Sequence, residues 1–281
     1  MLSEPGIRRG HRPRGVVLAL IVLLGAVGAC STSSPVPGTQ AAATAAPAKP
    51  GPPPELASYC SAVIDLLQVL EVGPDISANA TPEEVAAGLQ RFGSRFEPPL
   101  TAVEKIVPDV AREDVTTLGR QARFAVATKT PDPMMTPEFQ AALTRLHVNV
   151  VKQCGVPEIR VTSTEYKFEG IPSNVAAGAL SVSFINLGAE PHEMRVFGIP
   201  DGEARPFTVL LGLPQEQQDQ ELTPITPTLS ANPGSTDSEI IKLPLGRYGV
   251  ACLKLKGSTP AQDGTGPLHA TLGEAAEFTA Q

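Results

Sequence analysis

The sequence predicts an α+β protein with two folded domains, a small helical bundle over residues 55–156 and an antiparallel β-sandwich over residues 157–281. Apolar residues recur at spacings of three and four as far as Gly155, which is the period of an α-helix. Beyond Pro157 they alternate with polar residues, which is the period of a half-buried strand. A segment rich in Ser, Thr, Ala, Pro and Gly precedes both domains, so we expect the folded part to begin near residue 55.

Residues 1–29 have the pattern of an export signal and not of a folded element. Four arginines precede an apolar run over residues 16–27, which is too short for a membrane span. The segment Val27-Gly28-Ala29-Cys30 then resembles the lipobox of bacterial lipoproteins, in which the cysteine is acylated. The resemblance implies that Cys30 is the lipidation site, carrying palmitate or similar chains at the extracytoplasmic face of the cell membrane. An ordinary secretory signal with a chance cysteine is the alternative.

Residues 30–54 carry this cysteine and then a tether whose composition cannot bury enough apolar surface to fold. The whole chain has a net charge of −7, and the signal segment holds four arginines against one glutamate, so the mature chain is more acidic still. An acidic chain with no Trp and three Tyr argues against nucleic acid as a partner.

Apolar stripes and Pro-containing start signals predict four or five helices in the first domain. The first stripe consists of Leu56, Cys60, Val63, Leu67 and Leu70. The segment Thr81-Pro82-Glu83-Glu84 is a capping box that predicts a helix start, and we expect Pro98-Pro99 to break the chain again. A further stripe begins at Ala111. The last helix is predicted to start at Thr136-Pro137 and to end at Gly155.

Short alternating segments separated by Gly, Pro and Asn turns predict the strands of the second domain. Residues 179–186, 194–198 and 248–255 show this period of two, which is typical of an antiparallel sandwich. The stretch from Leu213 to Thr236 interrupts the pattern. We interpret it as an insertion, either a loop or a short helix, that the sandwich does not need.

Four cysteines are present, and an exported protein folds in an oxidising compartment. If Cys30 takes the lipid, Cys60 and Cys154 lie on the first and last helices of one domain and are predicted to form a disulfide. Cys252 is then left unpaired in a strand of the second domain. The alternative, pairing of Cys252 with either helical cysteine, would link the two domains and leave an unpaired thiol in the bundle.

Three segments of the second domain carry candidate metal ligands. They are Asn186-x-Gly188-x-x-x-His192, the strand from Gly246 to Cys252, and the loop from Pro267 to Glu274 that contains His269. Together with the segments Glu165-Tyr166-Lys167-Phe168 and 177–184, they resemble in their order the cupredoxins, the family of plastocyanin- and azurin-like blue copper proteins, over residues 157–281. The resemblance implies a cupredoxin-like sandwich.

The same resemblance implies a single copper ion held by His192, Cys252 and His269, with Glu274 as its axial ligand. A His₂Cys site with one weak axial ligand suits both oxidation states of copper and so permits electron transfer. Glu274 stands where the family usually carries Met, and a carboxylate there would favour Cu(II). Met194 is an alternative thioether ligand or a core residue. Sixteen residues separate Cys252 from His269, whereas compact blue-copper loops have only a few.

These features predict a membrane-anchored cell-envelope lipoprotein that uses copper for electron transfer or copper handling, with a redox or envelope protein as its partner. The alternative is a metal-free cupredoxin-like module with a structural or protein-binding role, because sandwich folds serve many functions. The sequence has no nucleophile elbow, phosphate loop or metalloprotease motif. We therefore do not expect an enzyme.

Overall fold

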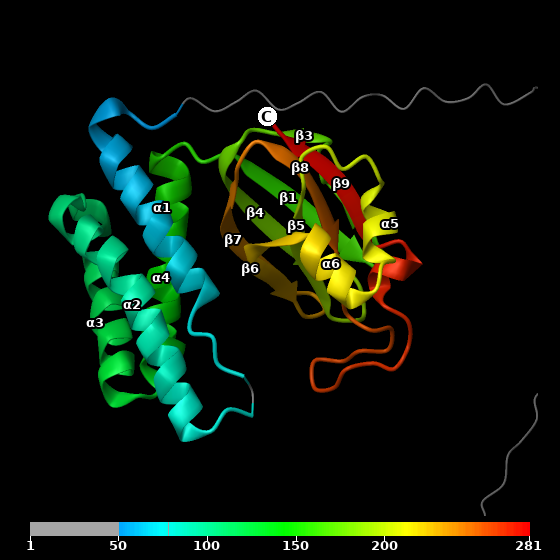
Figure 1. Ribbon diagram of the computed structural model, residues 1–281. Helices are drawn as coiled ribbons and strands as arrows, with labels where there is room; N and C mark the ends of the chain where they lie inside the picture. Colours follow the sequence, from blue (N-terminus) through cyan, green and yellow to red (C-terminus); the bar gives the residue numbers. More distant parts are fainter. Residues whose placement is uncertain (1–50, 78) are drawn as a thin grey trace, which may run out of the picture. The chain divides into compact units, whose positions relative to one another are not determined.

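The computed structural model describes residues 51–77 and 79–281 (Figure 1). The predicted signal, Cys30 and the tether as far as residue 50 lie outside the described residues. The described residues belong to one compact unit of the chain. Among the helices within it, none combines the length and the apolarity needed to cross a bilayer.

Helices make up the first part of this unit. They are η1 (Pro54–Leu56), α1 (Ala57–Val72), α2 (Pro82–Ile106), α3 (Asp109–Thr128), η2 (Asp132–Met135) and α4 (Pro137–Gln153). The predicted first stripe is buried on α1 from Cys60 to Leu70. The capping box forms as expected, because the Thr81 hydroxyl accepts from the Glu84 N–H at 3.3 Å and the Glu84 carboxylate accepts from the Thr81 N–H at 2.7 Å.

The expected break at Pro98-Pro99 is wrong, because α2 continues through both prolines to Ile106. A proline in a helix loses one backbone hydrogen bond and crowds the preceding turn. Here the apolar stripe persists across the prolines, since Phe92, Phe96 and Leu100 are all buried on one face. Burial of that face outweighs the local cost of the two prolines.

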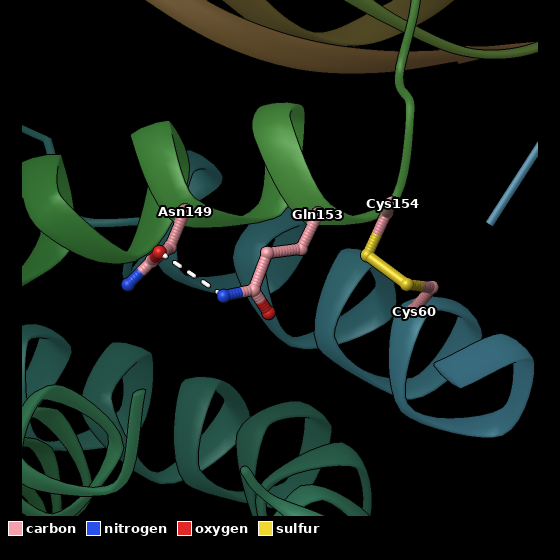
Figure 2. Close-up of a disulfide and its surroundings, with 4 residues drawn as sticks. All are labelled: Cys60, Asn149, Gln153 and Cys154. Carbon is pink, nitrogen blue, oxygen red and sulfur yellow. Dashed lines mark hydrogen bonds between the residues drawn. A yellow bond between two sulfur atoms is a disulfide. The ribbon is translucent and has the colours of Figure 1, made fainter. Parts of the chain in front are cut away.

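A disulfide joins the two ends of the bundle. Cys60 on α1 bonds to Cys154 directly after α4, with their Cα atoms 5.5 Å apart (Figure 2). The predicted pairing is confirmed, and Cys252 is the free and buried cysteine of the described part of the chain. The bond spans 94 residues, so in the loop-entropy model it constrains the unfolded chain by about 4–5 kcal/mol.

Two sheets form the second part. The strands are β1 (Glu158–Thr164), β2 (Lys167–Glu169), β3 (Asn174–Val175), β4 (Gly178–Asn186), β5 (His192–Ile199), β6 (Thr223–Ala231), β7 (Thr236–Leu243), β8 (Gly246–Ala251) and β9 (Ala275–Ala280). One sheet has the order β2-β1-β4-β7 and the other β3-β9-β8-β5-β6 (Figure 1). The predicted fold class, a disulfide-linked helical bundle followed by a β-sandwich, is confirmed. The sheets are mixed and not purely antiparallel, because β1 pairs with β4 and β3 with β9 in parallel.

The interpretation of residues 213–236 as a dispensable insertion is wrong. Part of it is helical, as α5 (Phe207–Leu211) leads into α6 (Gln215–Glu221). The rest is β6, which pairs with β5 along the edge of the second sheet. Pro224 and Pro227 made this strand hard to predict, because proline has no N–H to donate to a neighbouring strand. The strand forms nevertheless, because β6 lies at the sheet edge, where proline is tolerated.

The core of the sandwich consists of side chains that point inward from both sheets, among them Val161, Val182, Phe184, Val196 and Val250. In the second sheet β8 lies between β5 and β9 and is antiparallel to both. The start of β5, the end of β8 and the start of β9 therefore lie at the same end of the sandwich, where Ala251 pairs with both Arg195 and Ala275. All four predicted metal ligands lie at this end.

Candidate metal centre

The structure brings together His192, Cys252, His269 and Glu274, although the first and the last are 82 positions apart in the sequence. His192 is the first residue of β5, Cys252 directly follows β8, and Glu274 directly precedes β9. His269 begins the short helix η3 (His269–Leu272). One ligand atom from each residue lies within 4.8 Å of all the others.

The ring Nδ1 atoms of both histidines point into this cluster. His269 Nδ1 lies 3.3 Å from His192 Nδ1, 3.4 Å from Cys252 Sγ and 3.2 Å from Glu274 Oε2. His192 Nδ1 lies 2.8 Å from the same Glu274 oxygen. A metal ion with bonds of about 2.0–2.3 Å would hold its ligand atoms at separations of roughly this size.

All four side chains are fully buried, with relative exposures of 0%. Burial, and after it the negative charge of Glu274, raises the pKa of Cys252 to about 12. The metal-free thiol is therefore protonated at neutral pH, and metal binding has to displace its proton. The Glu193 N–H donates to Cys252 Sγ at 3.3 Å, and Ser163 donates its hydroxyl proton to the second oxygen of Glu274.

Asn186 sets the turn that leads to His192. Its side-chain amide donates to the carbonyl oxygens of Glu190 and Ala231 at 2.8 and 2.9 Å, and its side-chain oxygen accepts from the Gly188 N–H at 2.8 Å. These three bonds explain the Asn-x-Gly part of the sequence motif. They fix the loop between β4 and β5 and so fix the position at which β5 begins.

The long interval between Cys252 and His269 is bridged by an out-and-back excursion of the chain. Its base is closed by hydrogen bonds from the N–H of His269 to the carbonyl of Lys254 at 2.8 Å and from the N–H of Lys256 to that of Pro267 at 2.9 Å. Residues 257–266 lie beyond this base. Because its two arms pair with each other, the length of the loop does not prevent His269 from reaching Cys252.

Two carboxylates that the sequence interpretation missed lie next to the Nε2 atoms of the two histidines. His269 Nε2 is 3.0 Å from Glu190 Oε2, and His192 Nε2 is 3.4 Å from Glu165 Oε1. Burial by itself would raise the pKa of Glu190, but hydrogen bonds from the Gly257 N–H and from His269 outweigh it and lower the pKa. Glu190 could have been noticed two residues before His192. Glu165 lies 27 positions before His192, and nothing in its own segment indicated a role at the metal centre.

The donor set fits copper. Two imidazoles and a thiol, with a carboxylate as fourth group, combine ligands for Cu(I) and for Cu(II). A buried thiolate and carboxylate would be costly without a positive charge between them, which a bound metal ion supplies. Met194, the alternative thioether, is packed in the sandwich core with 1% exposure.

His147 lies outside this cluster, on α4. Its Nδ1 is 3.0 Å from Glu71 Oε1 and its Nε2 is 3.3 Å from the Ser181 hydroxyl, beside a cavity of about 730 Å³. This Ser-His-Glu arrangement is not apparent from the sequence. The Ser181 N–H donates to the Pro157 carbonyl in the sheet, so it cannot bind the oxyanion of an acyl-transfer reaction.

No protein-family model and no curated protein matches the chain. Among solved structures, it is similar to reduced auracyanin from the photosynthetic bacterium Roseiflexus castenholzii, with 20% identity over 44% of this chain and 96% of that one and a TM-score of 0.30. Auracyanin A, a blue copper protein from Chloroflexus aurantiacus, has 17% identity over 44% and 98% with a TM-score of 0.27. A copper-containing nitrite reductase from Thermus scotoductus has 13% identity over 44% and 31% with a TM-score of 0.25.

Proposed function

We propose that this protein is a lipid-anchored cell-envelope protein whose β-sandwich binds a single copper ion for electron transfer or copper handling. The observation that carries the proposal is the convergence of two Nδ1 atoms, one thiol and one carboxylate in a fully buried cluster. Burial of four ionisable groups without a role would be a large cost to the fold.

Electron transfer and copper handling suit this site better than catalytic turnover does. All four ligand side chains are closed off from solvent, whereas a metal ion that binds its substrate directly needs an open coordination position. An electron, in contrast, can pass through the buried ligands to a partner protein at the surface.

Addition of Cu(II) to the purified full chain tests the proposal. We expect intense visible absorption from thiolate-to-copper charge transfer and binding of one copper per chain. Cys252→Ser should abolish the colour, because the serine oxygen cannot replace the thiolate. His192→Ala should abolish or strongly weaken it, because one imidazole ligand is lost.

His147→Gln is the matched control, since it removes a histidine that lies outside the cluster, and it should leave the colour unchanged. A wild-type chain that stays colourless and binds no copper would contradict the proposal and favour the metal-free protein-binding module. Tight binding of zinc with no copper binding would reassign the site to a structural metal.

A further inference from the structure

Both histidines of the metal centre have a carboxylate on their outer side. Glu190 Oε2 lies 3.0 Å from His269 Nε2, and Glu165 Oε1 lies 3.4 Å from His192 Nε2. In each ring the other nitrogen, Nδ1, points at the metal cluster. In a neutral imidazole, donation of Nε2–H to a carboxylate leaves Nδ1 as the lone-pair atom, which is the form that binds a metal.

The two carboxylates are held by the protein and are not loose surface groups. Glu165 Oε1 accepts from the N–H groups of Ala189 and Glu190 at 2.6 and 2.8 Å. Glu190 accepts from the Gly257 N–H at 2.8 Å and from the Tyr166 hydroxyl at 3.2 Å. Glu165 therefore fixes the loop that carries Glu190, and the pair acts as one unit.

Gly188 gives independent evidence that room is kept for Glu165. A Cβ added at Gly188 would lie 2.9 Å from Glu165 Cδ, which is closer than real Cβ contacts come. Gly188 is not one of the glycines whose backbone φ is positive. Glycine here permits the close approach of the Glu165 carboxylate, which a Cβ at this position would displace.

Tyr166 closes the outer side of His269. The two ring centroids are 4.6 Å apart, and Lys256 Nζ lies 5.8 Å from the Tyr166 ring centroid. The imidazole is thus enclosed between the metal cluster, Glu190 and Tyr166, which accounts for its lack of exposure.

We propose that Glu165 and Glu190 are positioning residues that hold His192 and His269 with Nδ1 directed at the metal and strengthen both imidazoles as ligands. The inference rests on the proposed function for its metal, but the positioning itself is a property of this chain. Two negative charges behind the ligands stabilise a doubly charged ion more than a singly charged one. Their removal should therefore weaken Cu(II) binding more than Cu(I) binding.

Copper affinities of the full chain test whether the two carboxylates strengthen the imidazoles as ligands. They are measured for each oxidation state by competition with chelators. Glu190→Gln keeps the side-chain volume and an acceptor oxygen but removes the charge. We expect Cu(II) affinity to fall about 10- to 100-fold, with a smaller loss for Cu(I) and hence a higher reduction potential. Glu165→Gln should act in the same direction. Glu169→Gln, an exposed carboxylate of β2 that pairs with Lys167, is the matched control and should change neither affinity.

Proton NMR of the metal-free protein tests whether the two carboxylates hold the histidine rings in position. The Nε2–H of His269 should give a downfield signal that exchanges slowly with water, because the ring is fully buried and its Nε2 lies 3.0 Å from the Glu190 carboxylate. Glu190→Ala should lose that signal while the folded spectrum persists. Gly188→Ala, which displaces Glu165, should speed up exchange of the His192 Nε2–H.

Unchanged exchange in these variants, or equal losses of Cu(I) and Cu(II) affinity, would overturn the inference. Because the NMR signals are measured without copper, their outcome does not depend on whether copper binds. A wild-type chain that binds no copper would refute the proposed function, and the exchange rates would still decide whether the carboxylates position the two rings.

Discussion

Asn186 shapes the site although it is not one of the four clustered residues. Its fully buried side chain ties together three backbone groups, of Gly188, Glu190 and Ala231, and so joins the loop before β5 to the end of β6. Few side chains other than an amide can donate twice and accept once in this geometry. The asparagine of the sequence motif thus shapes the ligand loop and does not bind the metal.

Asn186→Ala should therefore lower the free energy of unfolding by about 2–4 kcal/mol, because it leaves buried backbone groups without partners. It should also weaken copper binding, since the start of β5 carries His192. Urea unfolding monitored by circular dichroism measures the first effect. Asn232→Ala, at an exposed turn position, is the control and should change stability by less than about 0.5 kcal/mol. Equal stability of both variants would contradict this role of Asn186.

At the scale of elements, α1, α4 and β7 meet around two carboxyl groups. The Glu71 side chain on α1 is 3% exposed. It accepts a hydrogen bond from the Ile240 N–H of β7 at 3.1 Å, and its Oε1 lies 3.0 Å from His147 Nδ1 of α4. Glu239 of β7 lies beside it, with one buried oxygen that has no hydrogen-bond partner within the described structure. Burial, and after it the negative charge of Glu71, raises the pKa of Glu239.

A carboxyl group whose pKa is higher in the folded protein than in the unfolded chain binds its proton more tightly when folded. Its stabilising contribution is complete below the ordinary carboxyl pKa of about 4.3 and is lost as the pH rises through the folded value. His147 faces the same pair from α4, and burial lowers its pKa, so its effect has the opposite sign near pH 6. Asp237 of β7 adds a further negative charge.

Glu239→Gln should consequently stabilise the protein at pH 9 relative to wild type by about 1–3 kcal/mol more than it does at pH 5. The amide keeps the shape of the protonated carboxyl and has no proton to lose. Urea unfolding of both proteins at the two pH values gives the difference. Glu158→Gln, an exposed carboxyl at the same cavity, is the control. A pH-independent difference for Glu239→Gln would show that Glu239 does not bind its proton more tightly in the folded protein.

At the scale of the whole molecule, the bundle and the sandwich share apolar packing. Ile240 of β7 and Ala179 of β4 pack into the core cluster of the helices, and Lys242 of β7 pairs with Asp65 of α1. The metal cluster is built only from residues of the sandwich. The helices thus support the sheet β2-β1-β4-β7 and contribute no ligand to the centre.

The proposed membrane anchoring concerns the whole chain and would depend on Cys30, which lies outside the described residues. We expect the wild-type protein to fractionate with membranes and to incorporate a labelled palmitate analogue, because several acyl chains hold a protein far more firmly than one. Cys30→Ala should lose both label and membrane association. Cys252→Ser should keep both, since its thiol is fully buried. A labelled, membrane-bound Cys30→Ala protein would exclude Cys30 as the lipidation site.

The fold class and the four clustered residues could be predicted because their signals are local. Helical stripes, alternating strands and short motifs around His192, Cys252 and His269 each lie within one short stretch of sequence. The continuous α2 and the edge strand β6 could not, because burial of one face and a place at the sheet edge overrode the prolines. Glu165 and Ser163 were missed because they reach the centre only through the pairing of β1 with distant strands.

The sequence by itself determined the periodicities, the number of cysteines and the residue types that can bind copper, since these depend on neighbours along the chain. Only the tertiary structure decided that two Nδ1 atoms, one sulfur and one oxygen converge, and that carboxylates stand behind both rings. Directions of side chains in space depend on strand register and loop closure. Those are fixed by contacts between residues tens of positions apart.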